Sequence, residues 1–194
     1  AFATTQNVSA TTEQKRTGSY AYKMDAGSPH GKVILSTDYD ELYFRIGLRL
    51  WVDNRYFLTL QNSSGNDIFH LRVYGCSIHA YRGDTDIASG GVIALNSWYC
   101  VEARIKIDNS VGVCQVKING VQVINFSGDT QDNDGTPDIR SIIFGNKKDY
   151  DAYQYQDDIA VNDTTGSVNN SWIGQGGIRP LLVNADGDHT GLTP

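Results

Sequence analysis

The acidic residues are the first place to look for catalysis, because hydrolysis of a glycosidic bond needs two carboxyl groups that face one another. The sequence has 19 Asp and only three Glu, and Glu13, Glu41 and Glu102 stand far apart. Asp157 and Asp158 are adjacent, and neighbouring residues of a strand point to opposite faces of the sheet. The acidic residues therefore predict no acid/base pair.

The histidines and serines point the same way. Nucleophilic catalysis needs a hydroxyl or thiol beside a general base. The four His, at positions 30, 70, 79 and 189, are scattered, and we expect His70 on the polar face of a strand. The sequence has no Gly-x-Ser-x-Gly element, which would present a serine on a sharp strand-to-helix turn. The sequence therefore predicts a protein that is not an enzyme.

Oxygen-rich loops are the candidate cation sites, because Ca²⁺ is bound by carboxylate and carbonyl oxygens. The run Thr130–Asp138 spaces its carboxylates like the start of a calcium loop, with Gly135 at the turn. It has no first Asp in register and no bidentate Glu at its end, so an ordinary Asp-rich loop is the favoured interpretation. Asn184–Asp188 is a weaker second candidate. A structural calcium ion would be held by Asp132, Asp134 and Asp138, and no other cofactor is expected.

A stripe of aromatic and basic side chains is the candidate binding surface. Tyr43, Arg45, Arg49 and Trp51 fall on one face of a single expected strand. Aromatic rings can stack on sugars while the arginines bond hydroxyl groups, which would make a glycan surface. Two alternatives remain: a solvated outer sheet on which the Arg stems cover the rings, or an interface with a partner chain, because Tyr, Trp and Arg dominate interface hot spots.

These side chains need strands to position them, and period-2 alternation dominates the sequence. Leu42–Val52 places six apolar residues on one face, and shorter alternations follow at Phe69–Tyr74, Tyr99–Ile107 and Cys114–Asn119. Asn119-Gly120 predicts a two-residue hairpin, because both positions need a positive φ. The pattern favours an all-β chain in which two antiparallel sheets pack face to face as a jelly-roll sandwich. We expect the sandwich over residues 1–163 and an irregular segment over 164–194, packed on the sandwich or leading to a missing part.

Charge and cysteine content narrow the possible partners. The formal net charge of −6 argues against nucleic acid and anionic membranes, which need clustered Lys and Arg. No apolar stretch is long enough to span a bilayer. Cys100 and Cys114 flank an expected turn, but their positions sum to 214, whereas direct cross-strand partners would sum to about 219–220 in a hairpin with that turn. Free thiols are therefore expected, with Cys114 in the core and Cys100 on the polar side.

Two stretches carry a resemblance to known proteins. Asn96–Ile107, followed by the hairpin around Asn119-Gly120, resembles the central strands of concanavalin A-like (laminin-G-like) jelly rolls. Tyr155–Gly174 and Asn184–Thr190 are similar to runs in phage virion proteins, although Gln175–Pro180 departs from that pattern. The resemblance implies a structural or accessory virion component, such as a capsid decoration or tail-associated protein.

Two hypotheses follow for the function. The leading one is a non-enzymatic virion protein on the virion surface or outside the cell, which binds other virion proteins or self-associates. The alternative is a lectin-like carbohydrate-binding module or adhesin, which uses Tyr43, Arg45, Arg49 and Trp51 on a cell-surface glycan. Neither hypothesis involves nucleic acid or a membrane.

Overall fold

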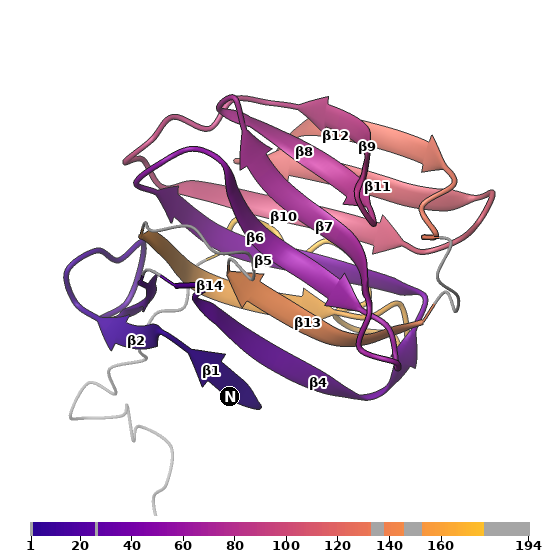
Figure 1. Cartoon of the computed structure of the whole chain (residues 1–194), viewed down its shortest axis with the longest axis horizontal. Coiled ribbons are helices and arrows are strands. Elements are labelled where there is room, and N and C mark those ends of the chain that lie inside the picture. The colour runs from indigo at the N-terminus through magenta and orange to yellow at the C-terminus, as the bar shows by residue number, and fades with distance from the viewer. Residues whose placement is uncertain (1, 26, 133–137, 146–152, 177–194) are drawn as a thin grey trace, which may run out of the picture.

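The protein is an antiparallel β-sandwich, as the sequence predicts. The computed structural model describes residues 2–25, 27–132, 138–145 and 153–176. These residues form fourteen strands and no helix (Figure 1). The described part of the chain accordingly contains no helix long and apolar enough to cross a membrane. The prediction of an all-β chain with two packed sheets is therefore confirmed.

Each sheet has seven strands. The first, sheet A, runs in the order β1 (Thr4–Gln6), β4 (His30–Tyr39), β13 (Ile139–Gly145), β6 (Arg55–Gln61), β7 (Asp67–Tyr74), β8 (Ser77–Arg82), β9 (Thr85–Gly90). The second, sheet B, runs in the order β12 (Val121–Gly128), β11 (Gly112–Ile118), β10 (Tyr99–Lys106), β5 (Glu41–Leu50), β14 (Gln154–Asn162), β3 (Ala21–Met24), β2 (Val8–Thr11).

The alternation of apolar and polar residues in β5 fixes which of its faces packs into the core. It lies in the middle of sheet B, between β10 and β14. Its even-numbered side chains, from Leu42 to Leu50, point into the core, where each is at most 1% exposed. Burial of such apolar side chains contributes roughly 1.5–3 kcal/mol each, so a register slip of one residue would be very costly.

The hairpin and the cysteines also follow the sequence. Asn119 and Gly120 have φ values of 50° and 81°, and Ile118 pairs with Val121 around them. Partners on β10 and β11 sum to 219, as in the pair Val101 and Ile118, and the three cysteines are free. Cys114 is in the core as expected. Cys100 lies on the outer face of sheet B but is fully buried, because further chain covers that face.

A bulge in β6 departs from simple alternation. The pairing with β7 jumps between Tyr56 and Leu58, so Phe57 is an extra residue and its side chain joins the core. The amides of Gln154 and Gln156, both on β14 and fully buried, cross the sandwich to the bulge. Gln154 Nε2 donates to the Tyr56 carbonyl over 3.1 Å, and Gln156 Nε2 donates to the Phe57 carbonyl over 2.9 Å.

A second bulge, in β14, corrects one expectation about the acidic pair. The sequence predicts that Asp157 and Asp158 point to opposite faces, but the pairing shifts between Asp157 and Ala160, and Asp158 has a φ of 50°. Both carboxylates therefore meet the same segment of the N-terminal region. Asp157 Oδ2 accepts the backbone N–H groups of Arg16 and Thr17, at 2.8 and 3.1 Å. Asp158 pairs with the Arg16 guanidinium over 2.6 Å.

The outer face of sheet B is covered by the described part of the C-terminal segment. Residues 164–176 contain no strand. Trp172 packs edge-on against Tyr43 with ring centres 5.6 Å apart, and Lys117 lies over the same indole at 3.7 Å. The Gly174 N–H donates to Glu102 Oε1 over 2.7 Å. This cover is why Tyr43 and Glu102 are buried although they face away from the core.

Candidate functional site

The predicted stripe on β5 does not form one exposed surface. Tyr43 and Arg45 are each only 8% exposed. Tyr43 lies under Trp172, and Arg45 Nε donates to the Asp158 carbonyl over 3.0 Å. Desolvation by this packing raises the pKa of the Tyr43 phenol, with a further contribution from Glu41. Both side chains therefore serve the fold on the covered face of sheet B.

The other two residues of the stripe lie at its open end. Arg49 stacks on Tyr155, its cross-strand partner, at 5.7 Å, and its Nε donates to the Asn96 carbonyl over 3.1 Å. Trp51 follows the end of β5 and is 53% exposed. Alternation along β5 identifies the shared face correctly, but the cover over half of that face comes from residues more than a hundred positions away.

The predicted calcium ligands are only partly within the described residues. Asp134 and the second candidate run, 184–188, lie outside them. Asp138 Oδ2 accepts the Ser63 backbone N–H over 3.2 Å. Asp132 lies close to the Cα of Gly83, where an added Cβ would come within 2.5 Å of its carboxylate. Across residues 2–25, 27–132, 138–145 and 153–176, no cluster of three His, Cys, Asp or Glu could hold a metal ion. Calcium binding stays a prediction.

A different surface, the outer face of sheet A, gathers polar and aromatic side chains from four neighbouring strands. The registers place these side chains in two adjacent rows across β6, β7, β8 and β9. One row runs Thr59, His70, Tyr81, Asp86, and the next runs Tyr56, Arg72, His79, Ser89. Tyr74 follows on β7 in the same orientation, two residues beyond Arg72. We call this set the sheet A cluster.

Arg72 is at the centre of the sheet A cluster. Its guanidinium carbon lies 5.1 Å from the Tyr56 ring centre, 4.9 Å from that of Tyr74 and 5.9 Å from that of Tyr81. Its Nε donates to Asn54 Oδ1 over 2.7 Å, and its Nη2 bonds the same oxygen. Asn54 has a φ of 66°, a conformation that Asn adopts more readily than most residues. The arginine is thus held in one orientation among three rings.

The histidines of the cluster are fixed by neighbours. His70 Nδ1 and Thr59 Oγ1 are 3.0 Å apart, and the His70 ring packs edge-on against Tyr56 at 5.3 Å. His79 Nδ1 is 2.7 Å from Asp86 Oδ2, and the His79 ring stacks on Tyr81 with centres 6.3 Å apart. Both imidazoles therefore present defined edges rather than a mixture of rotamers.

The cluster is buried at its base and open at its rim. Tyr56 and His70 are buried, whereas Tyr74 is 52% exposed. Arg72, His79 and Tyr81 are partly exposed between these limits. Desolvation raises the pKa of Tyr81, and the nearby Asp86 adds to the shift. The Tyr81 hydroxyl therefore keeps its proton and can donate a hydrogen bond at neutral pH.

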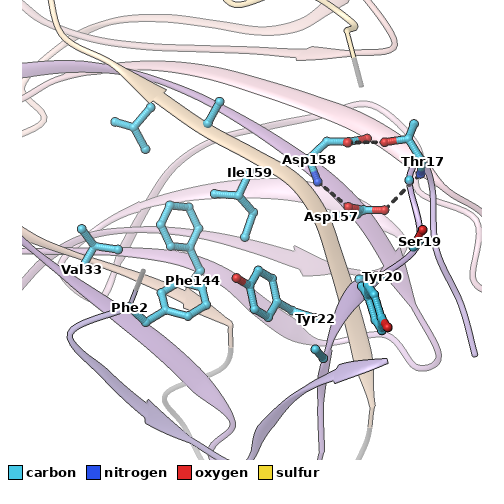
Figure 2. A pocket seen from close by; sticks show the side chains of 15 residues that line it. Phe2, Thr17, Ser19, Tyr20, Tyr22, Val33, Phe144, Asp157, Asp158 and Ile159 are labelled. Carbon is cyan, nitrogen blue, oxygen red and sulfur yellow. Dashed lines mark hydrogen bonds between the residues drawn. The ribbon is translucent and has the colours of Figure 1, made fainter. Parts of the chain in front are cut away.

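The structure also has a pocket at the edge of the sandwich, between β14 and the N-terminal strands, with a volume of about 790 Å³ (Figure 2). Its walls are largely apolar, with Phe2, Tyr22, Phe144 and Ile159 around the space. The acidic pair lies at one end, where its oxygens accept hydrogen bonds from the Arg16–Thr17 segment. The two carboxylates are thus engaged in holding the chain together.

Sequence reasoning placed only part of the sheet A cluster. The alternation at Phe69–Tyr74 puts His70, Arg72 and Tyr74 on the polar face of β7, as observed. It did not identify Tyr56, because the β6 bulge breaks the alternation there, or Tyr81, which joins the group only through the β7–β8 register. The sequence indicated this surface only through β7, where His70, Arg72 and Tyr74 lie on the same face.

Comparison with known proteins supports the fold. No family model and no curated protein matches the chain. Among solved structures, a mutant of the alginate lyase Aly36B in complex with an alginate trisaccharide is 17% identical, with a TM-score of 0.52, over 73% of this chain and 83% of that one. At such low identity the likeness shows a shared β-sandwich fold.

Two further structures contain the same sandwich as part of larger chains. Trypanosoma rangeli sialidase in complex with the inhibitor DANA is 14% identical with a TM-score of 0.56, over 79% of this chain and 27% of that one. Botulinum neurotoxin type C, whose cell entry depends on two ganglioside molecules, is 12% identical with a TM-score of 0.55, over 81% and 42%. The fold of this chain therefore matches only part of each of these longer proteins.

Proposed function

We propose that this protein is a non-enzymatic carbohydrate-binding module that holds its ligand on the sheet A cluster. The observation that carries the proposal is the position of Arg72 among Tyr56, Tyr74 and Tyr81. Sugar rings have apolar C–H faces that pack on aromatic rings, and hydroxyl groups that bond N–H donors and carboxylates. Tyr74 offers the exposed ring, while Arg72, His79 and Asp86 offer the polar groups.

The compared structures support this choice over a purely structural role. They are proteins of carbohydrate chemistry: a lyase with an alginate trisaccharide, a sialidase with an inhibitor, and a toxin that interacts with gangliosides. A shared fold does not fix function by itself, since one fold hosts many. The proposal therefore depends on the sheet A cluster, and the comparisons add a reason to test glycans first.

We also propose that the protein is not an enzyme, because the glutamates that could act as acid or base have structural partners. In the described residues Glu13 pairs with Lys23, and Glu41 pairs with Arg104. Glu102 is buried and accepts the Gly174 N–H. Each glutamate thus has a structural partner on sheet B or beside it. We place the protein outside the cell or on a particle surface, where glycans are found.

A virion role is a separate proposal, which the resemblance of Tyr155–Gly174 motivates. In the structure this run forms most of β14, the Asp158 side of the ion pair with Arg16, and the segment whose Trp172 covers Tyr43. These are folding roles that any sandwich of this kind could use. A glycan-binding module would also suit a virion surface, and co-sedimentation of the purified chain with phage particles is the test.

A glycan array with the purified chain and two variants tests the carbohydrate proposal. Wild type is expected to bind a defined subset of glycans, and Tyr74→Ala is expected to lose that binding about tenfold or more. Trp51→Ala is the matched control, because Trp51 is equally exposed but lies at the end of β5 in sheet B. Absence of any glycan ligand would refute the proposal, and loss of binding in Trp51→Ala alone would move the site to sheet B.

A further inference from the structure

We infer that Arg72 binds the carboxylate of an acidic sugar, so that the ligand of the sheet A cluster is an anionic glycan. This inference rests on the proposed function and narrows it to one class of ligand. The guanidinium of Arg72 has no carboxylate partner among the described residues, and the tyrosine rings around it would strengthen an ion pair with a carboxylate of the ligand.

The arginines of the protein differ in whether a carboxylate balances their charge. Within the described part of the chain, Arg16, Arg82, Arg104 and Arg140 each form an ion pair with a carboxylate. Arg45, Arg49 and Arg72 are in none of the ion pairs formed there. Arg45 and Arg49 lie on sheet B, whereas Arg72 lies in the sheet A cluster, where its Nε and Nη2 bond the neutral amide oxygen of Asn54. Its charge is therefore uncompensated by any adjacent carboxylate of the described residues.

The guanidinium of Arg72 is held in a fixed orientation. Because Nε and Nη2 are both held by Asn54 Oδ1, the plane of the group is fixed before a ligand arrives. The Nη1 atom carries two further N–H donors for a carboxylate, beside the Tyr81 hydroxyl, which also bonds Arg72. The three tyrosine rings displace water around the guanidinium, and an ion pair strengthens as the surrounding medium becomes less polar.

Two side chains of β7 are placed to contact a single sugar unit. Arg72 and Tyr74 are next to each other on the same face of β7, 4.9 Å apart from guanidinium carbon to ring centre. A pyranose ring that packs on Tyr74 can direct a carboxylate attached to that ring toward the neighbouring guanidinium. One acidic sugar could therefore pair with Arg72 and stack on Tyr74 at the same time, with Tyr81 donating to a neighbouring unit.

The overall charge of the protein does not favour acidic glycans. The protein has a net charge of −6, so its overall field repels polyanions. The pairing of His79 with Asp86 keeps the rim of the cluster from being broadly basic. Any preference for an acidic glycan must then arise locally, at Arg72. A single substitution of Arg72 can therefore test it.

Two matched pairs of ligands separate the possible sources of the carboxylate. The first pair is an oligogalacturonate and its methyl ester, and the second is 3′-sialyllactose and lactose. Isothermal titration calorimetry with the intact chain measures each affinity in low and high salt. We expect an acidic member to bind about tenfold or more tightly than its neutral partner, and the preference to shrink in high salt.

Variants locate the effect. Arg72→Gln is expected to reduce binding of the acidic member to the level of the neutral one. Arg72→Lys, which keeps the charge but not the planar fork, should retain part of the preference. Arg49→Gln is the control, because Arg49 also stacks on a tyrosine but lies on sheet B. Circular dichroism and the melting temperature verify that each variant is folded.

The outcomes distinguish the two proposals. A preference for the galacturonate or the sialyl ligand that disappears in Arg72→Gln supports the inference and names the sugar. Equal binding of acidic and neutral members, lost in Tyr74→Ala, overturns the inference but keeps glycan binding. An acidic preference unchanged in Arg72→Gln also overturns it. Absence of binding to all four ligands and across the glycan array overturns both.

Discussion

The side-chain amide of Gln156 in sheet B donates to the backbone carbonyl of Phe57 in sheet A, over 2.9 Å across the core. Phe57 is the extra residue of the β6 bulge, and a bulge leaves backbone groups without ladder partners. Buried carbonyls need a donor. The glutamine supplies it, and the bulge in turn places Tyr56 on the outer face beside Arg72. The interior of the sandwich thus supports the sheet A cluster.

The first prediction concerns this contact. Gln156→Met keeps the length of the side chain but removes the donor, so the Phe57 carbonyl is left buried without its partner. We expect the free energy of unfolding to fall by about 1–3 kcal/mol. Urea denaturation followed by tryptophan fluorescence measures the change. Gln115→Met is the control, since Gln115 bonds Asn125 on the exposed outer side of the sheet, and it should change stability by less than about 0.5 kcal/mol.

The same variant has a functional readout if the cluster binds glycans. Loosening of the β6 bulge would shift Tyr56 and with it the ring that packs on Arg72. Glycan affinity should therefore fall in Gln156→Met although no ligand contact is removed. Unchanged stability would contradict the role assigned to the cross-sheet hydrogen bond.

The second prediction concerns the ion pair between Arg16 and Asp158. The Asp158 side chain is fully buried and that of Arg16 is 18% exposed. Asp158→Asn removes the charge but suits the positive φ, and we expect a loss of about 3 kcal/mol because the arginine keeps an unpaired charge. Asp38→Asn breaks an exposed pair with Arg140 and should cost less than about 1 kcal/mol.

Hydrogen exchange localises that effect. Arg16 and Thr17 connect the N-terminal strands to β14, so amides of β2 and β3 should exchange faster in Asp158→Asn, while those of β10 and β11 should not. A uniform rise across both sheets would mean that the ion pair stabilises the whole fold rather than this attachment.

The third prediction uses the three thiols. Cys76 is partly exposed, whereas Cys100 and Cys114 are fully buried. Iodoacetamide at pH 8 should therefore label Cys76 alone in the native protein. Cys100 pairs with Gly47, whose Cα lies close to the aliphatic part of Arg16. Arg16→Ala should expose Cys100 to the reagent but leave Cys114 protected, as mass spectrometry of the digest would reveal.

The fourth prediction concerns alkaline stability. Burial raises the pKa of the Cys114 thiol from 9.0 to about 12. Well below pH 9 the Cys114 thiol is protonated, and therefore neutral, in both the folded and the unfolded protein. As the pH rises from 9 toward 12, the unfolded chain loses this proton before the folded one, so stability should fall by up to ~1.4 kcal/mol per pH unit.

Comparison with Cys114→Ala isolates this slope. The variant loses stability at all pH values because of the cavity, but it should lose less additional stability between pH 9 and 11 than wild type does. Burial also raises the pKa values of Tyr43, Tyr81 and Tyr155, but these side chains are the same in both proteins and contribute equally to each. Parallel stability curves for wild type and variant would contradict the prediction.

How much of this could be read from the sequence depends on how local each feature is. Alternation predicted β5, β7, β10 and β11, their inner faces and the Asn119-Gly120 hairpin, because side-chain direction in a strand is a property of consecutive residues. The same reasoning put His70, Arg72 and Tyr74 on one face. It failed at the bulges, where Phe57 and Asp158 break the period.

The composition of the site depended on tertiary structure. Tyr56, Arg72 and Tyr81 come from three strands, and only the register of β6, β7 and β8 brings them together. Burial of Tyr43 and Arg45 depended on Trp172 and Asp158, more than a hundred residues away. Outside the bulges, the sequence by itself determined which side chains point away from the core. Pairing and packing between distant segments decided which of those side chains are covered and which meet around Arg72, since the free energies of these contacts depend on neighbours that no local pattern encodes.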